Sequence, residues 1–325
     1  MAVILTILLF GVVVILHELG HFVTAKVNKI KINAFSIGMG PKIFSWDKNK
    51  TKYFLRAFPI GGYVSIDDNN FEKAPIQKRI VIILAGSLVN IISGFLIISI
   101  IVLIQGQFVS TKVKSAHFEQ HKIQVGDYID SVNNHHVFGA NDLVFELSKL
   151  DDNTPINITV LRNNEIVELD DVGFLINDGE RTHRTLGISL DTEQLTFSKF
   201  FETSFNSSIF VTKLVWVSMC DLFTGKISID NVSGPIGFTK SVSDAKTHGF
   251  LSVISLFPLL SINIGIFNLL PFPALDGGRF VFLLIELISK KKINKTIQNC
   301  VNTLGILLLI FLFVVIAIKD VFSFF

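Results

Sequence analysis

Hydrophobic residues form four long runs along the chain, separated by polar stretches. The first covers about residues 2–25, and the second, 80–104, contains no charged side chain. The third runs from about 250 to 271 and continues after a glycine-rich break into 280–288, and the fourth covers 301–318. A hydrocarbon core of about 30 Å is crossed by about 20 apolar residues in a helix. The pattern predicts four transmembrane helices, which place both termini on one side.

The chain between the second and third runs contains two stretches with different sequence patterns. Residues 107–190 contain short β-branched runs separated by turns such as 151–153 and Asn163-Asn164, with one helix expected at 141–149. This pattern predicts a small β-rich domain. Residues 191–249 mix aromatic and polar side chains, which indicates amphipathic helices at the membrane interface. Ordinary helices packed against the spans are the alternative.

Composition agrees with a membrane protein. Half of the residues are hydrophobic, mean hydropathy is +0.55, and charged residues make up 17%, against about 25% in soluble domains. A net charge of +2 without a basic tract gives no reason to expect a nucleic-acid partner. Residues 1–16 lack the basic start of a signal peptide, so we expect a retained span. Cys220 and Cys300 suggest no disulfide framework or zinc ribbon, and we expect both to be buried.

Charge asymmetry predicts the orientation. Residues 26–79 contain 11 Lys or Arg against 4 Asp or Glu, and four lysines lie within 290–295 after the third run. Such segments are typically cytoplasmic. Residues 106–250 contain 12 basic and 19 acidic side chains, as an exported region would. Residues 17–21 would then lie nearer the cytoplasmic leaflet.

His17, Glu18 and His21 form the motif HELGH within the first hydrophobic run. Positions i and i+4 share a helix face, so both imidazoles can bind one metal while Glu18 lies beside its open position. A bound zinc acidifies water, and the carboxylate accepts the proton. Three such groups within a span are costly unless they pair or bind metal. We therefore favour a metal centre, although a lone membrane histidine would more simply be a hydrogen-bonded interior residue.

A catalytic zinc needs a third protein ligand. The other six histidines fall in the predicted exported region, away from HELGH: His117, His121, His135, His136, His183 and His248. Asp276 follows the third run in segment 268–278, where two prolines and two glycines should break the helix on the side of HELGH. Asp276 could instead cap the next helix. Asn268 could hold a substrate carbonyl, although spacing alone favours an interhelical hydrogen bond.

The region between the first two spans contains two glycine-rich segments, 36–41 and 58–64. Paired β segments with glycine at points of close backbone approach would explain both. A sheet edge beside a metal site could hold an extended substrate by strand addition. Hairpins that only cover the membrane face are an equal alternative.

Taken in order, these motifs resemble those of bacterial site-2 proteases of the RseP type, the regulator of sigma E protease group. The matching segments are HELGH, GMGP (38–41), FPIGGYV (58–64), AGSLVN (85–90), VSGPIG (232–237) and NLLPFPALDGG (268–278). The resemblance covers nearly the whole chain. It implies that His17, His21 and Asp276 bind one Zn²⁺ per chain, with Glu18 as general base and acid.

The resemblance also implies roles away from the metal. Asn268 would contact the substrate backbone, and Gly61 and Gly62 would belong to a membrane-reentrant β element that holds the substrate extended. Residues 107–190 would form a PDZ domain, because 125–134 is similar to the core of such domains. The chain departs from the best-known relatives by having one PDZ-like region instead of two. Two further departures are Ser87 in place of a common proline and Asn134 in place of a common glycine.

The predicted fold is a polytopic α-helical membrane protein with four transmembrane helices, a membrane-associated β element and one exported β-rich PDZ-like domain. Its predicted parts are transmembrane helix 1 (1–26), a cytoplasmic or membrane-reentrant β region (27–79), transmembrane helix 2 (80–105), the PDZ-like domain (106–190), interfacial amphipathic helices (191–249), transmembrane helix 3 (250–289), and a basic loop with transmembrane helix 4 (290–325).

The resemblance implies a zinc-dependent intramembrane endopeptidase that cleaves spans of pre-cut single-span proteins, such as anti-sigma factor remnants or leftover signal peptides. The expected partners are these substrates, the lipid bilayer, and exported peptide tails at the PDZ-like domain. The expected location is the bacterial inner membrane, with the PDZ-like domain on the periplasmic or extracellular side. A membrane metal transporter and an inactive PDZ-bearing scaffold are the alternatives.

Overall fold

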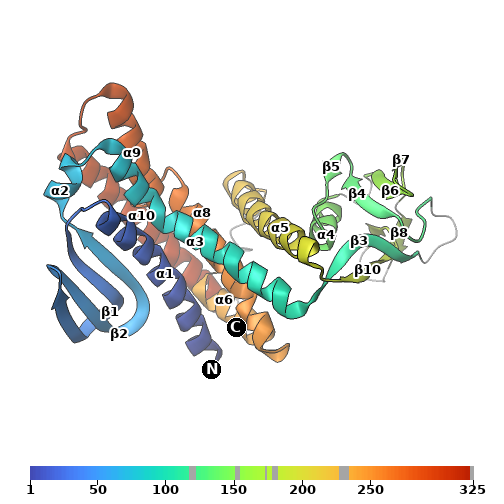
Figure 1. The fold of residues 1–325 in the computed structure, drawn as a ribbon, viewed down its shortest axis with the longest axis horizontal. Helices are drawn as coiled ribbons and strands as arrows, with labels where there is room; N and C mark the ends of the chain where they lie inside the picture. The colour runs from blue at the N-terminus through green and yellow to red at the C-terminus, as the bar shows by residue number, and fades with distance from the viewer. Residues whose placement is uncertain (117–121, 151–153, 173, 178–181, 227–233, 323–325) are drawn as a thin grey trace. The chain divides into compact units, whose positions relative to one another are not determined.

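The computed structural model describes residues 1–116, 122–150, 154–172, 174–177, 182–226 and 234–322. The chain divides into two compact units (Figure 1). Residues 1–97 and 214–325 form the first, here called the helical unit. Residues 98–213 form the second, the β-rich unit.

Four helices of the described chain are long and apolar enough to cross a membrane, as the hydrophobic runs predicted. They are α1 (Ala2–Val27), α3 (Ile76–Gln105), the pair α7 (Phe250–Ile254) and α8 (Leu256–Leu269), and α10 (Lys295–Phe322). Most of their side chains face outward, which suits a lipid solvent. The expectation that Cys220 and Cys300 are buried is wrong, because both are exposed free thiols on outward helix faces.

Small residues allow the helices of the helical unit to approach closely. A Cβ on Gly20 of α1 would lie 2.5 Å from the Ala85 carbonyl oxygen of α3. Likewise, a Cβ on Gly265 of α8 would lie 2.9 Å from the Ser87 carbonyl oxygen of α3. Lipid tails are as apolar as the helices, so close backbone packing of this kind supplies much of the association in a membrane. Helix α3 is therefore packed directly against both α1 and α8.

Strands β1 (Ile32–Lys48) and β2 (Thr51–Ile66) form a hairpin beside α1 (Figure 1), followed by α2 (Asp68–Lys73). The predicted paired β segments are thus present. Asn49 and Lys50 both have positive φ, as a two-residue turn between twisted strands requires. Residues 34–37 have partners in two segments of β2, 52–55 and 62–65, so the inner half of β1 is flanked on both edges.

Helix α6 (Pro235–Thr247) packs against α10 at the far end of the chain. The Gly237 N–H donates to the buried carboxylate of Asp320 at 2.9 Å, so α10 caps the first turn of α6. A Cβ on Gly234 would lie 2.8 Å from the same carboxylate oxygen. This contact explains why residue 234 is a glycine. Residues 232 and 233 of the same sequence motif lie outside the described residues.

The β-rich unit is built on an antiparallel sheet of order β10-β3-β4-β6-β7, with β5 paired to β4. Its elements are β3 (Gln107–Ala116), β4 (Tyr128–Val132), β5 (His135–His136), α4 (Ala140–Ser148), β6 (Ile158–Arg162), β7 (Glu165–Leu169), β8 (Phe174–Asn177), β9 (Thr182–Thr185), β10 (Ile188–Gln194) and the first part of α5 (Phe197–Phe223). Apolar side chains including Ile129, Ile156 and Val160 form its core.

The observed element bounds in the β-rich unit can be compared with those predicted from the sequence. The expected helix at 141–149 is α4, one residue earlier. Strand β10 continues to Gln194, so residues 191–194 are strand and not part of an interfacial helix as predicted. The expected turn at 151–153 lies outside the described residues. Asn134 has φ 65° in the turn before β5, a conformation that asparagine tolerates better than most residues and that explains its use in place of glycine.

Two buried ionic contacts stabilise the β-rich unit. The Arg162 guanidinium donates to both carboxylate oxygens of Asp127 at 2.8 Å. Lys213 of α5 contacts Asp142 at 2.8 Å and Glu146 at 2.6 Å, both on α4. Burial alone would raise the pKa of Asp127, but hydrogen bonds from Arg162 and the Gln124 N–H lower it below its ordinary value of 3.8.

We predict that Arg162→Gln destabilises the β-rich unit by about 2 kcal/mol at neutral pH, because Asp127 is 1% exposed and would lose charged hydrogen bonds. The lowered pKa of Asp127 stabilises the fold above pH 3.8, and this contribution disappears as the pH falls through the folded value. Calorimetry between pH 2 and 7 should therefore show the difference in stability between the variant and the parent narrow as the pH falls below 3.8. Lys199→Gln, which breaks an exposed pair with Glu202, is the control. A constant difference at every pH would contradict the assignment.

Candidate metal centre

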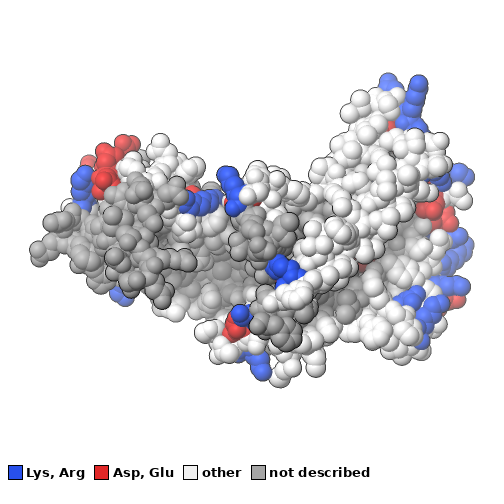
Figure 2. Space-filling model, turned by 180° about the vertical axis from the view of Figure 1, so that it is seen from behind, with Lys and Arg blue, Asp and Glu red and all other residues white. Residues whose placement is uncertain are grey.

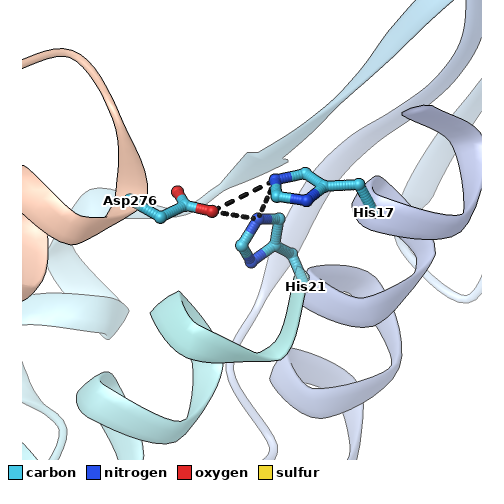
Figure 3. Close-up of side chains that lie close together, drawn as sticks. All are labelled: His17, His21 and Asp276. Carbon is cyan, nitrogen blue, oxygen red and sulfur yellow. Dashed lines mark hydrogen bonds and ion pairs between the residues drawn. The ribbon is translucent and has the colours of Figure 1, made fainter. Parts of the chain in front are cut away.

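His17 and His21 lie one helical turn apart on α1 and point toward Asp276 at the start of α9 (Asp276–Ser289), as Figure 3 shows. Each Nε2 atom lies 3.1 Å from the same Asp276 oxygen, Oδ2, and the two Nε2 atoms are 3.2 Å apart. His17 is 8% exposed. The three residues that the sequence singled out as ligands are therefore brought together.

The contacts of His21 indicate what belongs between these atoms. Its Nδ1 lies 2.8 Å from the Ile82 carbonyl oxygen of α3, an arrangement in which Nδ1–H donates and Nε2 keeps a lone pair. Among the described residues, no donor makes a hydrogen bond of good distance and angle to the buried Oδ2 atom of Asp276. Atoms whose lone pairs face one another at 3.1 Å need a proton or a metal ion between them. Ligands about 2.0–2.1 Å from a tetrahedral zinc lie about 3.3 Å apart, so the donor set and its spacing fit zinc.

Asp276 is positioned by the break between α8 and α9. Helix α8 ends at Leu269, and residues 270–275 form a loop that returns the chain to α1. A Cβ on Gly277 would collide with the Leu270 carbonyl oxygen, so this glycine is needed for α9 to start against the loop. The helix start has no side-chain cap, and Asp276 follows its N-cap, Leu275. The alternative role of Asp276 as a capping residue is therefore not observed.

Helix α10 supports the same loop from its other side. The Ala274 N–H lies 3.4 Å from the Asn302 Oδ1, and a Cβ on Gly305 would lie 2.5 Å from the Pro273 carbonyl oxygen. Ala274 has φ 77°, a conformation that non-glycine residues adopt only when their surroundings impose it. Helix α10 thus helps to fix Asp276, the third candidate ligand.

Glu18 contacts the β hairpin. The Val64 N–H of β2 donates to Glu18 Oε2 at 2.9 Å. A Cβ on Gly62 would lie 3.8 Å from Glu18 Cγ and 2.6 Å from the Ser36 carbonyl oxygen. Gly62 therefore lies beside the HELGH motif, as expected for a β element bordering the site. Gly61, with φ 77°, packs instead against Met39.

Within the described part of the chain, Asn268 does not make the interhelical hydrogen bond that spacing favoured. Its Nδ2 donates to the Ile264 carbonyl oxygen at 2.9 Å, one turn earlier in α8. Its side chain is part-buried, eight residues before Asp276, which begins α9. The structure thus assigns Asn268 a local contact within α8.

Gly86 is a site residue that sequence reasoning missed. A Cβ on Gly86 of α3 would lie 2.5 Å from His21 Nε2 and 2.8 Å from His17 Nε2. Any side chain there would displace the imidazoles. The sequence offered one signal, a glycine within the apolar second run, but only the packing of α3 on α1 shows that it faces the histidines.

A buried ion pair connects the helix of Asp276 to α3. Arg79 donates to both Glu286 oxygens, at 2.8 and 3.0 Å, across 207 residues of sequence. Arg79 is 7% exposed and its guanidinium lies over the Phe71 ring. Because Arg79 lies one turn before Ile82, this pair ties α9 to the turn of α3 that orients His21.

The known proteins that resemble this chain in sequence agree on one family. Residues 5–312 match the sequence profile described as peptidase family M50. A protein of Fusobacterium nucleatum, provisionally named a zinc metalloprotease, is 36% identical over 100% of both chains. One of Clostridium acetobutylicum with the same provisional name is 35% identical over 98% of this chain and 97% of its own. The regulator of sigma-W protease RasP of Bacillus subtilis is 26% identical over 98% of each chain.

We predict that Gly86→Ala lowers the zinc content of the purified protein at least about tenfold, because the added methyl displaces two of the three ligand atoms. Metal analysis by mass spectrometry measures this directly. Gly139→Ala is the matched control, since a Cβ there meets nothing within 4 Å. Full zinc occupancy in Gly86→Ala would show that the histidines are not held against α3.

Proposed function

The chain belongs to peptidase family M50, and from this premise we propose that it is a zinc-dependent intramembrane endopeptidase of the site-2 type. It is a membrane protein and a metalloprotease, with Zn²⁺ as its cofactor. One observation carries the finer proposal: three ligand atoms converge on one point between helices whose other surfaces are apolar. We assign the zinc to His17, His21 and Asp276.

The remaining residues supply the chemistry around the metal. When bound, zinc polarises the scissile carbonyl and acidifies a water molecule. Glu18 accepts the proton of that water and delivers it to the leaving amine, which requires a carboxylate held in one place. The hydrogen bond from the Val64 N–H fixes Glu18 Oε2 and leaves Oε1 for the proton. Asn268 holds the substrate backbone in this proposal, once its amide turns from Ile264.

A substrate helix must unwind before its amide can react, because the helix encloses its own backbone. Strand β2 borders Glu18 through Gly62 and Val64, so an extended substrate segment can add along this part of the hairpin. Gly61 has positive φ just before this segment, a backbone conformation that glycine adopts without strain. We propose that strand addition of this kind presents the unwound segment to the metal.

The biological substrates we propose are single-span proteins already cut outside the membrane, including anti-sigma factor remnants and leftover signal peptides. The name of RasP, a regulator of sigma-W protease, supports a role in regulated proteolysis. The proposed location is the bacterial inner membrane, with HELGH nearer the cytoplasmic leaflet. The β-rich unit would be a PDZ-like domain on the outer side that contacts exported peptide tails.

We predict that Glu18→Gln reduces cleavage of a single-span model substrate in proteoliposomes by at least about 1,000-fold, because the amide cannot accept the proton. Zinc content should remain unchanged, since Glu18 is not among the proposed ligands. Asp276→Asn should lower both activity and zinc content, which separates loss of the base from loss of the metal. Cleavage by Glu18→Gln at the parent rate would refute the mechanism.

A further inference from the structure

The outer half of β1 lies open on both faces, whereas in the facing part of β2 Thr51 is buried and Tyr53, Phe54 and Arg56 are half-buried. Residues 39–58 are here called the hairpin arm. Each residue from 39 to 48 is exposed, whereas most of 32–38 is buried. A strand in a soluble domain covers at least one face, because its side chains alternate between core and solvent. The exposed apolar side chains of the arm are Met39, Ile43, Phe44, Trp46, Leu55 and Phe58.

The hairpin arm is also basic. Within 39–58 the only acidic side chain is Asp47, against five basic ones: Lys42, Lys48, Lys50, Lys52 and Arg56. Three of the lysines flank the turn at the tip. Lys and Arg atoms gather over the hairpin at the lower right of Figure 2. A tip with this charge attracts an anionic surface.

Aromatic rings are interleaved with these cations. Trp46 stacks on Tyr53, with ring centroids 5.2 Å apart and planes at 8°, and Phe44 lies 5.6 Å from Trp46. On Phe54, Lys42 Nζ lies 4.4 Å from the ring centroid. Tryptophan and tyrosine concentrate at the level of lipid headgroups, where one part of the ring is apolar and the other wet. Lysines beside such rings bind anionic lipids.

We propose that the hairpin arm is a binding surface for anionic phospholipid headgroups. The aromatic row enters the interface, and Lys48, Lys50 and Lys52 contact the phosphates around the tip. Charge complementarity selects lipid over an uncharged protein partner, and the arm belongs to the same unit as the spans. This inference concerns a surface outside the metal centre and does not depend on proteolysis.

The chain offers its own probe, because Trp46 and Trp216 are the only tryptophans. In the full-length Trp216→Phe protein, Trp46 alone reports on nearby lipids. The protein is placed in nanodiscs of phosphatidylcholine with one third phosphatidylglycerol. Two samples are compared: in one the phosphatidylglycerol has brominated acyl chains, and in the other the phosphatidylcholine has them. We expect brominated phosphatidylglycerol to quench Trp46 about two- to fivefold more than its share of the bilayer predicts, since each lysine favours anionic lipid.

The triple variant Lys48→Gln, Lys50→Gln, Lys52→Gln should reduce this preference to the bilayer share. Its matched control changes three lysines of the β-rich unit, Lys114, Lys122 and Lys199, to glutamine and should keep the preference. The proposal is overturned if phosphatidylglycerol shows no enrichment at Trp46, or if the triple variant keeps it. An acidic peptide that shields Trp46 from a soluble quencher without any lipid preference would assign the arm to an acidic protein segment instead.

Discussion

Three electron pairs must share one cation in surroundings that offer almost no water, and this constraint explains most of the helical unit. Uncompensated, a carboxylate between apolar helices is costly, and two imidazole lone pairs add repulsion. Helix α1 supplies two ligand atoms through helical periodicity alone. The third candidate ligand atom, Oδ2 of Asp276, belongs to a segment 255 residues after His21. It lies 3.1 Å from the Nε2 atom of each histidine. The break between α8 and α9, the close-packed glycines beside it and the contacts of α10 together place Asp276 next to the histidines.

Helix α3 acts as the common reference for both sides of the site. Its Ile82 carbonyl fixes the tautomer of His21, its Gly86 leaves space for the two rings, and its Arg79 holds the far end of α9 through Glu286. Breaking one partner of a buried pair such as Arg79 and Glu286 costs about 3–5 kcal/mol, because the other charge is left without compensation. The same helix thus sets the position of α1 and of α9, so a shift of α3 would change all three ligand distances together.

The sequence was sufficient where one element determines the outcome by itself. Apolar run length predicted the spans, and the i, i+4 spacing of His17 and His21 predicted a shared ligand face. Asp276 could be found because proline and glycine mark the break before it. The sequence could not identify the roles of Gly86, Arg79 and Asp320, because each acts through a partner on another helix. No local pattern shows which helix faces will be in contact. The boundary at 190 was misplaced for a related reason: residues 191–194 are polar enough for a loop, and only pairing with β3 makes them strand.

The hairpin connects two environments through one continuous strand. Strand β2 begins at the basic arm and ends beside Glu18, to which Val64 donates. Between these points the Pro59 carbonyl oxygen packs so closely on Gly11 of α1 that a Cβ there would collide with it. This contact anchors the strand, and the register shifts between Met39 and Phe44 bend β1 where the arm begins. Residues 52–55 of the arm pair with residues 34–37, which pair in turn with residues 62–65, so the arm and the segment that contacts Glu18 belong to one sheet. Strand pairing thus links the surface that we propose binds lipid to Val64, whose N–H donates to the Glu18 carboxylate.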